Sequence, residues 1–270
     1  MRISNRYVVL FTVPAIALGM CVSSSRADEE LDITKFEISF EENFDALDVT
    51  PWGTKPSRWI AHTPWNGDFG DAKFSNPTPG FPFVTNGGIL RIEARKFKDE
   101  KWQSGLLASV NRDHIGFSQI GGYFEARMKF PEGPGVWPAF WLVGTDRTKF
   151  VAEIDVVEFY GHTPGRFSSK RHIWRSKFGG QDDSLYKRTD VPMGSLSSSY
   201  HTYGVRLTPD YITYYFDRKQ IWRTDTPPEY LGISFFPLVN LALGSGWSIS
   251  DTPNPSFLYV DYVHVYKERK

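Results

Sequence analysis

The stretch VAEIDVVEF at residues 151–159 places three carboxylates inside a run of apolar, largely β-branched side chains. Such a run is typical of a buried β-strand. Acidic side chains rarely enter a buried strand unless a partner or a reaction needs them. We therefore expect Glu153, Asp155 and Glu158 to perform acid–base chemistry. Two alternatives stay open, a salt-bridged acidic strand edge and a calcium site, although calcium loops are normally rich in Gly, Asp and Asn.

The spacing of the three acids predicts a local irregularity. Side chains alternate between the two faces of a strand, so Glu153 and Asp155 point the same way. Glu158 follows Glu153 by five residues, and strict alternation would turn it to the opposite face. An extra residue at Val156-Val157, forming a β-bulge, would bring Glu158 back, as bulges do beside active sites.

Two glutamates on one face suit glycosidic bond cleavage. Retaining glycosidases hold their two carboxyl groups ~5–5.5 Å apart and inverting ones ~6.5–9.5 Å apart, and leaning side chains could reach the shorter separation. One carboxylate would attack as the ionised form, and the other would protonate the leaving oxygen. Asp155 between them would keep the two ionisation states apart.

The first 27 residues have the features of a secretory signal peptide. A basic start is followed by the apolar stretch 8–22 and by Ser25-Arg26-Ala27, which has the small-x-small shape of a cleavage site. Cys21 permits a lipoprotein signal, but Met20 before it is larger than that cleavage prefers. We expect a secreted protein, periplasmic or extracellular, that has no membrane association after cleavage. Residues 28–38 are expected to be a flexible, acidic lead-in, and residues 39–270 a single catalytic domain.

Composition limits the class of partner. Three of the 31 basic side chains (Arg2, Arg6 and Arg26) leave with the signal peptide, so 28 remain against 31 acidic ones. The only cysteine leaves as well, so the mature chain has no disulfides. A domain of ~240 residues can bury enough surface to be stable without them. Near-neutral charge without long basic clusters argues against nucleic acid and anionic membranes as partners. We expect a monomer that binds a polysaccharide.

Strand-like runs alternate with turn residues over the whole domain, and convincing amphipathic helices are absent. Residues 121–130 alternate in polarity, which predicts a half-buried antiparallel strand. Further strands are expected at residues 89–94, 105–110, 201–207, 212–216, 220–224, 236–243 and 258–267. An all-β chain of this size with regular turns is a sandwich or a barrel.

The stretch GVWPAFWL at residues 135–142 adds a candidate sugar-binding face. Trp137, Ala139 and Trp141 share one face, where the two rings could stack on pyranose rings or simply pack in the core. Pro138 cannot donate to a strand ladder, so this position should be irregular or unpaired on one side.

Together these motifs resemble glycoside hydrolase family 16. The resemblance runs roughly from residue 40 to residue 266 and is carried by GYFEAR at 122–127, WPAFW at 137–141, EIDVVE at 153–158, NLALG at 240–244 with Trp247, and VDYVHVY at 260–266. It implies an all-β fold, a β-jelly-roll sandwich of two curved antiparallel sheets. It also implies an open concave cleft suited to cutting chains internally.

Residue roles follow from that resemblance. Glu153 matches the nucleophile, Glu158 the general acid/base and Asp155 the assisting carboxylate, with no cofactor required for catalysis. Substrate contacts are expected from Trp137, Trp141, His172, Trp174, Asn240 and Trp247. Asp261 matches a structural calcium ligand, helped by carbonyl groups near Asn43 and Gly88. Apart from the resemblance, residues 65–71 are rich in hydrogen-bonding groups, and this composition predicts a loop at the cleft rim. Lys170-Arg171 and Lys187-Arg188 are expected to be solvated surface, although they could favour an acidic polysaccharide.

The sequence therefore predicts a secreted retaining endo-glycosidase. Its substrate would be a β-1,3-glucan, a β-1,3-1,4-glucan or a bacterial exopolysaccharide. A non-catalytic, lectin-like carbohydrate-binding sandwich is one alternative, which the three acids speak against. A transglycosylase on the same scaffold is another.

Overall fold

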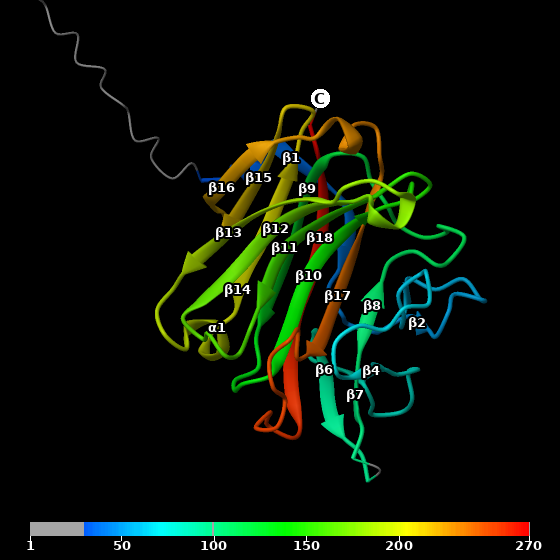
Figure 1. Ribbon diagram of the computed structural model, residues 1–270, viewed down its shortest axis with the longest axis vertical. Coiled ribbons are helices and arrows are strands. Elements are labelled where there is room, and N and C mark those ends of the chain that lie inside the picture. Colours follow the sequence, from blue (N-terminus) through cyan, green and yellow to red (C-terminus); the bar gives the residue numbers. More distant parts are fainter. Residues whose placement is uncertain (1–29, 99, 270) are drawn as a thin grey trace, which may run out of the picture.

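The computed structural model describes residues 30–98 and 100–269. The expected signal peptide and residues 28–29 of the expected lead-in lie outside these ranges. The chain forms two curved sheets packed face to face (Figure 1). Its helical elements are η1 (Ile33–Lys35), η2 (Ser176–Phe178), α1 (Ser195–Ser198) and η3 (Pro228–Tyr230). Within the described ranges, none of the helices has the length and apolar character needed to traverse a bilayer.

One layer is a ten-stranded sheet. Its order is β16 (Lys219–Asp225), β15 (Tyr211–Phe216), β14 (His201–Leu207), β9 (Gly122–Lys129), β18 (Ser256–Glu268), β6 (Ile89–Lys96), β7 (Trp102–Ser104) and β4 (Lys73–Phe74). Two further strands join it, β1 (Phe36–Glu42) on β18 and β5 (Phe83–Asn86) on β6.

The other layer is an eight-stranded sheet. Its order is β13 (Asp183–Asp190), β12 (Arg166–Trp174), β11 (Val151–Phe159), β10 (Val136–Gly144), β17 (Phe235–Leu243), β8 (Leu106–Ala108), β3 (Trp59–Ile60) and β2 (Val49–Thr50). The predicted jelly-roll sandwich is confirmed with one difference: the sheets are mixed, because β2 pairs parallel with β3 and β4 pairs parallel with β7.

The predicted strands are all present, with ends that move by at most two residues. Their inward residues form the core between the sheets. Phe124 and Met128 of β9, Phe140 and Leu142 of β10, and Ile154 of β11 belong to one buried cluster. This inward packing leaves the alternate residues of β10 and β11 on the opposite face of the eight-stranded sheet.

The strand at residues 121–130 is not half-buried as predicted. Tyr123 and Glu125, expected on its polar face, have no exposed surface. Asp217 and Arg218 both adopt positive φ in the turn that joins β15 to β16. The Arg218 guanidinium forms hydrogen bonds of 2.9 and 3.0 Å to the two carboxylate oxygens of Glu125. The hydroxyl groups of Tyr123 and Tyr262 donate to the same carboxylate.

The expected flexible lead-in is also corrected in part. Leu31 and Phe36 are buried in a small cluster with Tyr123, Tyr215 and Tyr266, and β1 pairs antiparallel with β18. Isolated apolar residues gain burial here through a partner strand more than 200 residues away in the sequence, as in the pairing of Phe36 with Glu268. A local pattern does not contain that information.

Candidate active site

Strand β11 carries the predicted bulge. Along β10, Trp141 pairs with Asp155, Phe140 with Val157 and Ala139 with Glu158, so Val156 has no partner. The register with β12 breaks at the same place, between Asp155 and Glu158. Both valines are buried against the core, 2% and 0% exposed. The extra residue is thus absorbed on the core side, and Glu158 returns to the face that carries Asp155.

The three carboxylates line one cavity of about 320 Å³ on the eight-stranded sheet. Aromatic rings form much of its remaining wall. Its lining consists of Trp65, Phe69, Trp137, Ala139, Trp141, Glu153, Asp155, Glu158, Lys170, His172, Trp174 and Asn240. The structure therefore brings together all of the sequence-predicted catalytic and substrate-binding residues except Trp247, which follows the end of β17.

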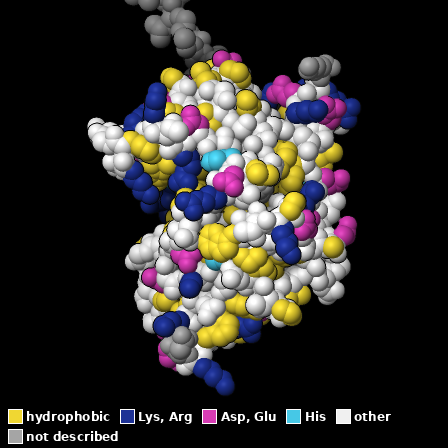
Figure 2. All heavy atoms as spheres, turned by 90° about the vertical axis from the view of Figure 1, so that its right-hand side faces the viewer, with side chains coloured by type: hydrophobic (Ala, Val, Ile, Leu, Met, Phe, Trp, Pro, Cys, Tyr) yellow, Lys and Arg dark blue, Asp and Glu magenta, His cyan; other side chains and the backbone are white. Residues whose placement is uncertain are grey.

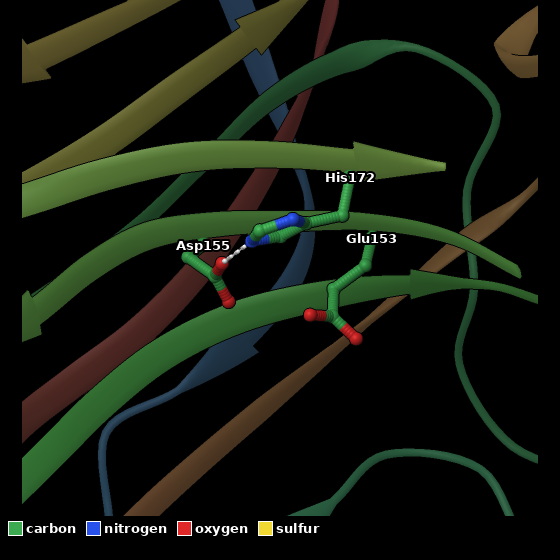
Figure 3. A group of neighbouring side chains, drawn as sticks. All are labelled: Glu153, Asp155 and His172. Carbon is green, nitrogen blue, oxygen red and sulfur yellow. Dashed lines mark ion pairs between the residues drawn. The ribbon is translucent and has the colours of Figure 1, made fainter. Parts of the chain in front are cut away.

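Glu153, Asp155 and His172 form the most compact part of the cavity (Figure 3). One ligand atom from each lies within 4.8 Å of those of the other two. His172 pairs with Glu153 across the β11–β12 ladder, and its Nε2 lies 3.2 Å from Asp155 Oδ2. The Tyr230 hydroxyl shares its one hydrogen between the backbone carbonyls of Glu153 and His172, whose oxygens lie 2.8 and 2.7 Å from it. This tyrosine therefore ties the two strands together at the position of the expected nucleophile.

Glu158 is held by three donors. The indole N–H of Trp137 and the hydroxyl of Tyr160 both donate to Oε1 at 2.9 Å. The Lys170 ammonium lies 2.5 Å from Oε2 and also donates to the Tyr160 oxygen at 3.1 Å. The prediction that Lys170 is solvated surface is wrong, because its side chain is only 25% exposed and lines the cavity.

The electrostatics of the site favour proton retention. Burial, and after it the negative charge of Asp155, raises the pKa of Glu153 well above the ordinary glutamate value, while a hydrogen bond with Trp174 opposes the shift. Burial and Asp155 also raise the pKa of Glu158, with Lys170 acting in the opposite direction. Crowded carboxylates of this kind share protons instead of ionising together. The site can thus present a carboxylate and a carboxylic acid side by side.

Asn240 offers a donor to a ligand. It is fully buried on β17, and its Oδ1 accepts a 2.8 Å hydrogen bond from the Trp141 indole. Its Nδ2 is buried and has no hydrogen-bond partner among the residues that the structure describes, and the residue lines the cavity. Buried donors normally have a hydrogen-bond acceptor. A sugar hydroxyl in the cavity would supply the acceptor that this Nδ2 group lacks.

The sequence profile described as "Glycosyl hydrolases family 16" matches residues 81–263. The chain belongs to this family. The endo-1,3-1,4-beta-glycanase ExsH of Rhizobium meliloti (strain 1021) is 34% identical over 198 residues, which cover 68% of this chain and 39% of that protein. The beta-glucanase of Rhodothermus marinus is 29% identical over 209 residues, 67% of this chain and 68% of the relative. The chain thus spans well under half of ExsH.

A solved structure agrees with the fold of this family 16 chain. The laminarinase catalytic domain from Thermotoga maritima MSB8 superposes with a TM-score of 0.67 at 22% identity, covering 87% of this chain and 100% of that one. The fold is therefore the jelly roll of these enzymes.

Several predictions about the rim of the cavity can be compared with the structure. Trp65 and Phe69, from the expected rim loop, line the cavity. Trp247 lies outside the lining, half exposed, with its ring stacked on His162 at 4.9 Å. Pro138 pairs with Leu241 of β17, whereas the register with β11 begins only at the next residue, so this proline is unpaired on one side as predicted.

The expected calcium ligand has a different partner in this structure. The Asp261 carboxylate forms an ion pair with Arg127 of β9. A guanidinium at this carboxylate does not fit a divalent cation held by the same oxygen, because the two positive charges would repel each other. In this arrangement Asp261 does not fit the expected calcium site, and no step of the chemistry depends on calcium. Arg171, expected at the surface, is buried and pairs with Asp183 at 2.6 Å.

Tyr160 and Tyr230 were assigned no role from the sequence, and Lys170 was named there only as surface. Tyr160 follows Glu158 by two residues, and Lys170 precedes His172 by two, so strand alternation alone places each beside a predicted residue. Tyr230 reaches the site from the short η3 segment, and no local pattern marks it.

Proposed function

We propose that this protein is a retaining endo-glycosidase that hydrolyses internal β-linkages of a glucan-type polysaccharide. The observation that carries the proposal is the bulge, which sets Glu158 on the same cavity wall as Glu153 and Asp155. The names of ExsH and of the Rhodothermus enzyme support the substrate class.

In the proposed reaction, Glu153 attacks the anomeric carbon as a carboxylate while protonated Glu158 gives its proton to the departing oxygen. Glu158, now ionised, then takes a proton from water, and the hydroxide portion displaces Glu153 from the sugar. Asp155, paired with His172, keeps negative charge beside Glu153 and so disfavours simultaneous ionisation of all three acids. Two displacements at one carbon return the original anomeric configuration.

A substrate screen tests the proposal. Purified protein is incubated with laminarin, lichenan, agarose, carrageenan and a succinoglycan-type polymer, and the released oligosaccharides are sized. We expect a ladder of internal fragments from at least one β-glucan, with the initial products in the β configuration by proton NMR. Absence of cleavage across the panel, or initial products of inverted configuration, contradicts the proposal. Products longer than the substrate would instead indicate transglycosylation.

Secretion and a monomeric state are further parts of this proposal. Apolar residues 8–22 after a basic start support export. Immunodetection in the medium or periplasm, and light scattering of the purified protein, test the two expectations separately.

A further inference from the structure

Lys170 places a positive charge directly beside the expected acid/base, Glu158. It lies opposite Asp155 across the β11–β12 ladder, so its side chain shares the face of the catalytic acids. Its ammonium is 2.5 Å from Glu158 Oε2. Among the ion pairs of residues 30–98 and 100–269, Glu158 is the partner of Lys170 and no other carboxylate pairs with it.

This contact competes with the acid step. Oε1 of Glu158 already accepts hydrogen bonds from Trp137 and Tyr160. The catalytic proton therefore belongs on Oε2, the oxygen that faces Lys170. An ammonium has only donors, and it stabilises the ionised carboxylate rather than the acid. Proton and ammonium thus compete for one oxygen.

The resting arrangement consequently favours the wrong proton distribution. The cation stands beside Glu158, which must be protonated for the first step. Glu153, which must be ionised, has an indole N–H but no ammonium or guanidinium in hydrogen-bonding contact among the described residues, and Arg147 acts on it through its charge alone. Moving the ammonium away from Glu158 would reverse the preference. A group on the substrate must then accept the hydrogen bonds and the charge of the Lys170 ammonium.

The neighbouring surface favours an anionic acceptor. On the far side of β12, the ladder pairs Lys170 with Tyr186 and Ser168 with Arg188, which places Arg188 on the same sheet face. Arg188 lies over the Tyr186 ring, 5.3 Å from its centroid, and no carboxylate of the described ranges forms an ion pair with it. Figure 2 shows Lys and Arg side chains gathered beside a hollow at one edge of the molecule. The sheet beyond Glu158 therefore offers two cations to a polymer.

We propose that Lys170 is a specificity-determining residue that recognises an anionic substituent on the leaving-group side of the substrate. The substituent draws the ammonium away from Glu158 Oε2, which leaves that oxygen free to hold the catalytic proton. The enzyme would therefore favour acidic polysaccharides over neutral ones. This inference rests on the proposed function and adds the substrate's charge to it.

Charged groups from every neighbouring element enter this competition. Facing Glu158 are Glu153, Asp155 and Tyr160 from β11 and the residue after it, Lys170 and His172 from β12, and the neutral donors Trp137 and Asn240 from β10 and β17. Only Lys170 among them carries a permanent positive charge, so its substitution isolates the effect.

The experiment compares three forms of one glucan that the enzyme cleaves: neutral, lightly carboxymethylated and lightly sulfated, matched in length and degree of substitution. Initial rates give kcat/KM for the wild type, Lys170→Met and Lys170→Arg. Lys187→Met, an exposed lysine on β13, is the matched control. We expect the wild type and the control to favour the anionic forms by about tenfold, the arginine variant to retain the preference, and the methionine variant to lose it. Preference for the carboxymethylated form alone would identify a carboxylate, and preference for both forms any anion.

A pH profile on the neutral glucan provides a second readout. Removing the ammonium raises the pKa of the Glu158 carboxyl, so the alkaline limb of kcat should move to higher pH in Lys170→Met. This inference is overturned if the wild type shows no preference for anionic glucans, or if Lys170→Met keeps that preference. In either case, observed cleavage still supports the proposed function. Failure to cleave any form of any β-glucan refutes the proposed function and this inference with it.

Discussion

Glu125 in β9 and Glu158 in β11 are both buried glutamates in central strands, 0% and 5% exposed, yet the structure treats them differently. Glu125 receives two hydrogen bonds from Arg218 and one each from Tyr123 and Tyr262. Both carboxylate oxygens therefore have hydrogen-bond partners within the protein. This carboxylate holds two strands and a turn together.

Glu158 shares its surroundings with two other carboxylates and a single lysine. It also faces a cavity, where a ligand can change its partners. Each glutamate has one cationic partner, so the difference between them lies in the number of neighbouring acids and in access to the cavity, not in burial. A buried acid with fixed cationic partners is a structural element, whereas crowded acids short of cations can exchange protons.

Replacing the cleft acids gives the largest expected effect. Glu153→Gln or Glu158→Gln should reduce turnover of a cleaved glucan by about 1,000-fold or more, because nucleophilic attack or proton transfer is lost. In Glu153→Gln the amide keeps the shape and removes a carboxyl whose pKa burial raises, so the melting temperature should hold or rise. Glu158→Gln also leaves Lys170 without its carboxylate, so its melting temperature should fall. Reducing-sugar release and thermal unfolding measure the two effects. Retained cleavage by the Glu158 variant would remove its assignment as acid/base.

Replacing Glu125 in the ten-stranded sheet should have the opposite effect, a loss of stability with little change in turnover. Glu125→Gln leaves Arg218 without its carboxylate, and breaking such a buried pair costs about 3 kcal/mol of unfolding free energy. Turnover by the folded fraction should stay near that of the wild type. Glu37→Gln, which breaks the exposed pair with Lys267, is the control and should change stability by no more than about 0.5 kcal/mol. Equal losses in both variants, measured by urea unfolding, would mean that the Glu125 cluster has no special structural role.

The smallest expected effect is on the pH dependence of the unfolding free energy, which also distinguishes the cleft acids from Glu125. Burial raises the pKa of Glu153 and Glu158, so the native protein holds protons that the unfolded chain releases above the ordinary glutamate pKa of 4.5. The stability these carboxyls contribute is present below that pH and is lost as pH rises through their folded pKa. The unfolding free energy of the double Gln variant, minus that of the wild type, should therefore grow with pH in this window. A difference that stays flat, or that shrinks, would contradict the raised pKa.

Local signals in the sequence were sufficient for the catalytic strand. Alternation fixed the faces of Glu153 and Asp155, and the misfit of Glu158 with that alternation predicted the bulge. The long strands were predictable for the same reason, because period-two patterning is written in consecutive residues. Such information requires no knowledge of which strand lies next door.

Pairing between distant strands was not predictable in this way. Glu125 appeared polar and exposed because Arg218 reaches it from a turn more than 90 residues later. Lys170 looked like solvated surface because its partner is known only once β12 is placed beside β11. The two-residue strands β2, β3 and β4 are too short to carry any periodicity and exist only through the neighbours they pair with.

The unpaired Val156 of β11 also determines which single-residue deletions this strand can tolerate. Phe140 faces Val157 and Ala139 faces Glu158, which is the register that a regular strand lacking Val156 would have. Loss of that codon should leave the glutamate over the cleft, now by alternation alone, whereas loss of the Ile154 codon should reverse Glu153 relative to its neighbours. Turnover of the two deletion proteins would distinguish them. Homologues one residue shorter here are thus expected to remain active, and alignments should open their gap between Asp155 and Glu158.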